Sequence, residues 1–169
     1  MNLPPQLETK FQTLENRYPV KRSALIPMLL YAQDQFGYVS DDMIGEIARR
    51  LGLNTLQVTE TMEYYSMLRR QRAGKFHVQV CTNVSCMLRG GNKIYEFCQK
   101  KLEIGHKETT DDGIFSLEEV ECIGVCCWAP AIQVNYDFHD DLTNDKVDAV
   151  LNTYRTKTQN GAKGEEANA

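Results

Sequence analysis

A chain of 169 residues allows one domain, or one domain with a substantial extension. Its 42% hydrophobic and 25% charged residues are ordinary for a globular protein, and a net charge of −4 argues against non-specific binding to nucleic acid. No apolar run approaches the roughly 20 residues that a membrane-spanning helix requires, so we expect no direct membrane insertion.

The N-terminal stretch MNLPPQLETKFQTLENRYPV has neither a secretory nor a transit-peptide pattern, so we expect the protein in the reducing cytoplasm. In that compartment, a metal site explains the six cysteines better than a framework of disulfides does.

The first part of the chain predicts a bundle of four short helices, each with apolar residues at helical spacing. We expect the first helix to end near Tyr18, before a proline, and the second to span 23–36. The third and fourth helices are expected to follow N-caps at Ser40 and Asn54.

The pattern changes at the basic stretch LRRQRAGK, which precedes an alternating, strand-like run. We therefore divide the chain into a helical bundle, 1–73, a second domain, 74–156, and a polar tail, 157–169, that is expected to be disordered.

The second domain predicts the order β-α-β, loop, β-β-α, which matches a thioredoxin-like sheet with a loop in place of a crossover helix. The fold class is therefore mixed, α+β or α/β. The expected elements are strands over 75–81, 114–121 and 131–136, a helix over 87–103, a turn over 137–141, a short strand with Leu142, and a final helix capped by Thr143.

Four cysteines form two pairs at the ends of strand-like runs. Cys81 and Cys86 are spaced C-x4-C, and Cys122 and Cys126 follow with the spacing C-x3-C. A [2Fe–2S] cluster requires four ligands, two on each iron, and thiolate is the usual ligand. We predict such a cluster, with one pair of cysteines on each iron.

Other sites for these cysteines are less compatible with the spacing. A structural zinc also takes four thiolates but usually uses C-x2-C knuckles, so it stays an alternative. A thioredoxin redox pair requires C-x-x-C, which is absent. Cys127 could replace Cys126, although neighbours in an extended loop point in opposite directions. Cys98 is expected to be a small buried apolar residue.

Residues around the cysteines suggest a tuned environment. Gly124 is expected to let loop amides approach the sulfur atoms. Trp128 and Pro130 are expected to shield the site, and a cis peptide before Pro130 would suit the fold. Three glutamates either face the cluster and lower its reduction potential or lie on a solvated strand face: Glu118, Glu119 and Glu121.

Several segments resemble one family over about residues 5–155. QDQFGYVS, MEYYSMLRRQRAGKFHVQVCTNVSC, DDGIFSLEEVEC and GVCCWAP resemble the thioredoxin-like [2Fe–2S] subunit of NADH:quinone oxidoreductase, which is respiratory complex I. Two positions, Glu63 and Arg72, depart from the family pattern, and neither bears on a ligand.

The resemblance implies that Cys81, Cys86, Cys122 and Cys126 are the cluster ligands. It also implies a non-catalytic redox subunit whose partner flavoprotein binds FMN, NADH and a [4Fe–4S] cluster, alongside other peripheral-arm subunits. The [2Fe–2S] cluster would accept one electron from the flavin side, and the N-terminal helices would clasp the flavoprotein. A bacterial protein on the cytoplasmic face of the plasma membrane is expected.

Three other functions fit parts of the sequence. The same module could serve as the diaphorase subunit of an NAD-linked hydrogenase or formate dehydrogenase. A free thioredoxin-like ferredoxin would have no use for 72 helical residues, and a zinc-stabilised interaction module would have no redox role. The chain itself has no nucleotide-binding glycine motif and no nucleophile arrangement.

Overall fold

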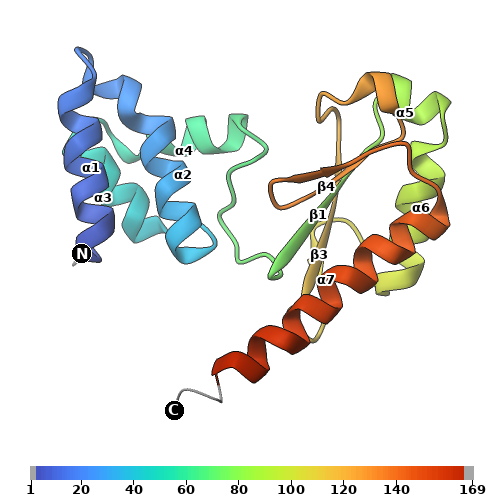
Figure 1. Cartoon of the computed structure of the whole chain (residues 1–169). Helices are drawn as coiled ribbons and strands as arrows, with labels where there is room; N and C mark the ends of the chain where they lie inside the picture. Colours follow the sequence, from blue (N-terminus) through green and yellow to red (C-terminus); the bar gives the residue numbers. More distant parts are fainter. Residues whose placement is uncertain (1–2, 166–169) are drawn as a thin grey trace. The chain divides into compact units, whose positions relative to one another are not determined.

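Two hydrophobic cores form in the chain, one in each of two units (Figure 1). A computed structural model describes residues 3–165, with side chains through residue 158. The units are Met1–Arg72 and Ala73–Ala169. The sequence predicts this boundary one residue later.

The first unit contains the four predicted helices. They are α1 (Pro5–Arg17), α2 (Leu25–Phe36), α3 (Asp41–Leu51) and α4 (Thr55–Tyr64), and a 3-10 turn, η1 (Lys21–Ala24), precedes α2. The apolar faces of these helices meet in a core that includes Phe11, Met28 and Ile47. Because their amphipathic stripes carry the prediction, the helices are found where the sequence places them.

The predicted N-caps of this unit are confirmed. Ser40 Oγ accepts a hydrogen bond from the Met43 amide at 3.3 Å, and Asn54 forms a reciprocal capping box with Gln57. The helix α2 ends at Gly37, whose φ of 81° is the left-handed conformation expected there.

Arg50 on α3 joins three carboxylates within the helical unit. Its guanidinium lies 2.5 Å from Glu8 and 3.3 Å from Glu15, both on α1, and 2.6 Å from Glu46. Hydrogen bonds from Arg49 and Arg50 lower the pKa of Glu46 from 4.5 to about 2 against the opposing effect of burial. Glu46 therefore stabilises the fold above its unfolded pKa, and this contribution is lost as the pH falls from about 4.5 to 2.

The second unit is built on a five-stranded sheet in the order β2-β3-β1-β4-β5. The strands are β1 (Phe76–Cys81), β2 (Glu108–Thr109), β3 (Phe115–Val120), β4 (Ile132–Val134) and β5 (Asp137–His139). β1 and β3 are parallel, and the other pairs are antiparallel. Apolar residues of α6 (Gly91–Leu102) and α7 (Asn144–Glu165) pack against one face of the sheet (Figure 1).

The predicted helix over 87–103 is wrong at its start. Two helices occupy this region, α5 (Val84–Leu88) and α6, and they are separated at Gly90. Gly90 has a φ of 96°, a conformation that interrupts a right-handed helix and that glycine adopts without steric cost. Asn83 accepts a hydrogen bond from the Val84 amide and so marks an earlier helix start than the sequence suggests.

The predicted turn over 137–141 and the strand at Leu142 are also wrong. β4 and β5 form a hairpin that turns at 135–136, and Leu142 is a buried residue after it. Asn135 adopts a φ of 55°, and its side chain accepts from the His77 amide and donates to Lys75 O. This asparagine fixes the turn because its short amide bonds to the neighbouring strand.

The last helix is longer than predicted. α7 continues through Glu165, so the disordered tail predicted over 157–169 is wrong for 157–165, and 166–169 lie outside the described residues. A helix already started by packed turns extends at little cost through residues of good helix propensity. None of the helices in the described part of the chain has the length and apolar character needed to cross a bilayer.

Replacing Arg50 with methionine should destabilise the helical unit by about 2 kcal/mol, because three carboxylates would lose their shared charged donor. Thermal or urea unfolding followed by circular dichroism at pH 7 measures this effect. Arg49→Met is the matched control. The Arg49 side chain is 68% exposed and contacts only Glu46, so its loss should cost much less. Equal losses in the two variants would contradict the role given to Arg50.

Candidate metal centre

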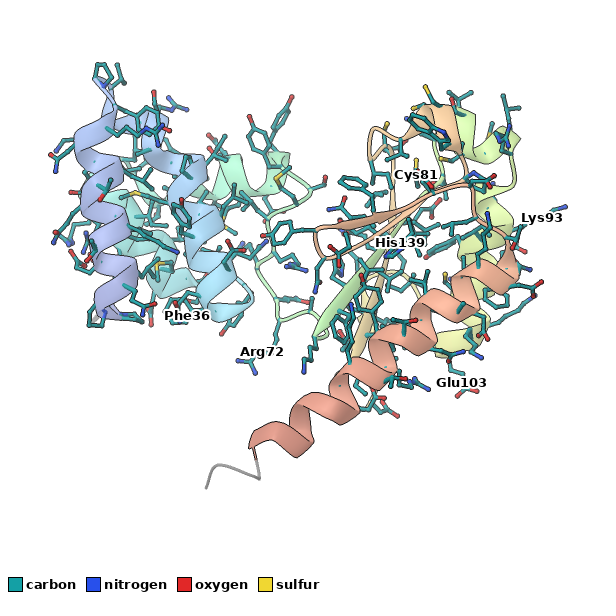
Figure 2. All side chains as sticks on the ribbon, viewed as in Figure 1. Phe36, Arg72, Cys81, Lys93, Glu103 and His139 are labelled. Atoms are coloured by element: carbon teal, nitrogen blue, oxygen red, sulfur yellow. The ribbon has the colours of Figure 1, made fainter. Side chains whose placement is uncertain are left out.

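The pairing of β1 with β3 brings the two cysteine segments together. Cys81 is the last residue of β1, and its partner in the parallel register is Val120, the last residue of β3. Cys122 follows two residues later, so both segments leave the sheet at the same end. Figure 2 labels Cys81 where β1 ends.

The first cysteine pair lies in a buried, well-supported place. Cys81 and Cys86 are each 2% exposed and pack with Ala129 and Ile123. Burial, together with a hydrogen bond to Cys81, raises the pKa of the Cys86 thiol to about 11. Binding of a metal must therefore displace protons from this pair, as metal binding to thiols generally does.

The second pair lies in an exposed loop. Both Cys122 and Cys126 are exposed, and Cys126 begins a 3-10 turn, η2 (Cys126–Trp128). Gly124 has a φ of 81°, and its amide donates to Cys122 Sγ at 3.4 Å. A hydrogen bond to Cys122 raises the pKa of Cys126. The expectation that a loop amide at Gly124 approaches sulfur is confirmed.

Contacts across the two segments bring the pairs next to each other. Cys126 lies near Cys81 and hydrogen-bonds the hydroxyl of Ser85, which directly precedes Cys86. Arg89 Nε donates to Ala129 O at 2.7 Å and so ties α5 to the second loop. The four thiols are grouped as two adjoining pairs. Among the described residues, no three His, Cys, Asp or Glu side chains are gathered closely enough to hold a single metal ion.

Cys127 is exposed, and no contact links it to another cysteine among the described residues. Cys126, in contrast, bonds to Cys122. The reason expected for this difference is wrong, because the two residues lie in a 3-10 turn and not in an extended loop. The contact with Cys122 supports Cys126 as the ligand.

One glutamate near the site has a structural role that the sequence did not suggest. Glu118 is 7% exposed, and its Oε2 lies 3.0 Å from His77 Nε2, while Ser116 Oγ lies 2.8 Å from His77 Nδ1. Burial would raise the pKa of Glu118, but hydrogen bonds from His77 and Gln79 lower it. Glu118 therefore neither faces solvent nor contacts a cysteine; the exposed glutamates are Glu119 and Glu121.

Three smaller expectations have clear outcomes. The Ala129–Pro130 peptide is cis, and Cys98 is fully buried, which raises the pKa of its thiol to about 12. Trp128 does not shield the thiols within this chain, because it is 63% exposed.

Gly91 is a residue of the site that sequence reasoning missed. A Cβ atom there would lie 2.7 Å from Cys81 O and 2.9 Å from Cys86 O. The start of α6 can therefore pack against both cysteine segments only if this position is glycine. The signal was the Gly-Gly pair shortly after a predicted ligand, where one glycine breaks the helix and the other permits the contact.

The donor set fits an iron–sulfur cluster. Thiolates are the ligands that such clusters prefer, and their grouping in two pairs matches two irons that each take two sulfur ligands. The hydrogen bonds from Gly124 and Ser85 to cysteine sulfur are the outer contacts that such ligands usually receive.

The chain belongs to the thioredoxin-like [2Fe–2S] ferredoxin family, whose model matches residues 11–155. The predicted fold class, a helical bundle followed by a thioredoxin-like [2Fe–2S] domain, is confirmed. The fold also resembles that of an NAD+-reducing [NiFe]-hydrogenase in its air-oxidised state, with a TM-score of 0.65 at 15% identity. That match covers 76% of this chain and 23% of the hydrogenase chain.

Within this family, the chain is similar to proteins that are named as one particular subunit of NADH-quinone oxidoreductase. The Rickettsia prowazekii protein is 40% identical over 157 residues, which are 89% of each chain. A protein of the same name from Rhizobium meliloti is 40% identical over 139 residues, 82% of this chain and 83% of that protein. The Mycobacterium bovis protein is 35% identical over 90% of this chain and 61% of its own length. The resemblance seen in the sequence is therefore confirmed.

Gly91→Ala should abolish or strongly reduce cluster loading, because the added Cβ collides with backbone that carries both Cys81 and Cys86. Iron and sulfide content per chain after anaerobic reconstitution measures the effect. Gly45→Ala is the control: it lies in α3 with open space around it, so it should stabilise the helical unit by about 0.5–1 kcal/mol and leave loading intact. Full loading of Gly91→Ala would contradict the packing requirement.

Proposed function

We propose that this chain is the electron-transfer subunit of an NADH:quinone oxidoreductase. Its [2Fe–2S] cluster, held by Cys81, Cys86, Cys122 and Cys126, exchanges one electron with the FMN of an NADH-oxidising flavoprotein subunit. The observation that carries this proposal is the meeting of two cysteine pairs at one end of the sheet, in a chain 40% identical to a named subunit of NADH-quinone oxidoreductase.

The residues of the chain support a relay and not a substrate site. When bound, the cluster supplies one-electron chemistry, and the four thiolates hold it in place. Cys81 and Cys86 exclude water from one half of the site, whereas Cys122 and Cys126 leave the other half open. NADH oxidation is accordingly assigned to the partner, which binds FMN, NADH and a [4Fe–4S] cluster.

Exposed apolar residues beside the cysteines support a protein partner at this end of the sheet. On α5, Val84 is 58%, Met87 47% and Leu88 77% exposed, and on η2 Trp128 is 63% exposed. Exposed apolar groups of this size are typical of interaction surfaces. The helical unit is proposed to contribute a second docking surface, with the assembly in the peripheral arm at the cytoplasmic face of the membrane.

The alternative is the diaphorase subunit of an NAD-linked hydrogenase or formate dehydrogenase. The similarity to the NAD+-reducing hydrogenase supports this alternative at the level of fold only, because the identity is 15%. The named relatives at 35–40% identity favour the quinone-linked assembly.

Cys126→Ser should destroy the cluster or change its spectrum strongly, because a serine oxygen is a poor substitute for the thiolate. Cys127→Ser should leave cluster content and spectra unchanged, since Cys127 contacts no other cysteine in the described chain. Visible absorption and EPR of the reduced proteins measure both variants. The reverse outcome would overturn the ligand assignment.

Co-expression with a flavoprotein subunit should yield a complex containing iron, sulfide and FMN, with an EPR signal of a reduced [2Fe–2S] cluster. A colourless, EPR-silent chain that contains zinc would sink the proposed function. Leu88→Asp should weaken association on the order of tenfold, because it puts a charge into the apolar contact. Phe138→Asp, on an edge strand and 55% exposed in the wild type, is the matched control and should associate normally.

A further inference from the structure

Ser85 is the one side chain in the described chain that donates a hydrogen bond to a cysteine sulfur from the opposite segment. It lies in α5, half-buried, directly before Cys86, and its hydroxyl reaches Cys126 on the second loop. The other donors near the thiols are backbone amides: Gly124 to Cys122 and Ala131 to Cys86. Ser85 is therefore the donor that substitution can remove without disturbing the backbone.

The geometry around Ser85 holds this contact in place. Asn83 caps α5, and Arg89 at its end bonds to Ala129 O at 2.7 Å, next to the turn that carries Cys126. Cys86 packs directly against Ala129. Both ends of this short helix are thus fixed, so the hydroxyl is aimed at Cys126 by the fold and not by a mobile loop.

We infer that Ser85 is a positioning residue that raises the reduction potential of the cluster by donating its hydroxyl hydrogen to the Cys126 thiolate. The inference rests on the proposed [2Fe–2S] function and on Cys126 as a ligand. One electron enters from the partner's flavin, or from dithionite in a test. No bond breaks, and the hydroxyl proton stays on Ser85.

The direction of the effect follows from charge. The added electron makes the ligand sulfurs more negative, and a hydrogen bond to a charged acceptor is stronger than one to a less charged acceptor. The bond therefore stabilises the reduced form more than the oxidised form. Hydrogen bonds to sulfur are among the factors that set the potential of iron–sulfur clusters.

The test is a redox titration of the cluster-loaded full chain, followed by EPR. Ser85→Ala should lower the potential, so that at a fixed solution potential the ratio of reduced to oxidised cluster falls on the order of fivefold. The shift should be the same at pH 6 and pH 8, because the hydroxyl does not titrate there. Ser85→Thr keeps the hydroxyl and should restore most of the wild-type potential.

Thr82→Val is the matched control, because it removes a hydroxyl beside Cys81 whose partner is Glu119 and not sulfur. Its potential should stay close to that of the wild type. If Ser85→Ala takes up a normal cluster with an unchanged potential, the inference about Ser85 is wrong while the proposed function stands. If no variant and no wild-type preparation yields the [2Fe–2S] signal, the proposed function itself fails.

A second measurement decides the case in which Ser85→Ala does not load. Pulsed EPR of the reduced wild type should detect a strongly coupled proton that exchanges in D2O and persists, slightly shifted, in Ser85→Thr. A signal that is identical in these two proteins, or that contains only backbone amide protons, would contradict the hydrogen bond.

Discussion

The parallel pairing of β1 with β3 is the constraint on which the site depends. Parallel strands end on the same side of a sheet, so residues 40 positions apart in the chain, Cys81 and Glu121, come within hydrogen-bonding distance of each other. Two glycines make this packing possible. A Cβ at Gly74 would lie 2.4 Å from Phe115, where β3 begins, and one at Gly91 would meet Cys81 O. The site is therefore fixed from both ends of β1.

The two halves of the site differ in how they are held. The first pair is on a strand end and a capped helix, in a place that is closed to water. The second pair is on a loop that bonds to itself and to α5 through few contacts. One half therefore provides rigidity, which keeps the geometry of the site, and the other provides access, which electron exchange with a partner requires.

Much of the fold could be predicted because it follows from local patterns. The helical stripes, the N-caps at Ser40 and Asn54, and the alternation in β1 each depend on neighbouring residues only. The break at Gly90 and the hairpin at Asn135 could not, because each adopts a positive φ whose stabilising contacts come from elsewhere in the fold. The cysteine spacing similarly predicts the type of site, whereas Ser85, Arg89 and Gly91 act through segments that only the folded sheet brings together.

The hydrogen bonds to sulfur are concentrated where water is also available, at Cys122 and Cys126. In the free chain, water can stabilise the negative charge that an added electron brings. A partner that covers Leu88 and Trp128 removes that water and makes the charge more costly to hold. The same exclusion strengthens the remaining hydrogen bonds, because they act in a medium of lower dielectric constant. Donors built into the loop thus replace the solvent that docking displaces, and the reduced form stays accessible in the assembled state.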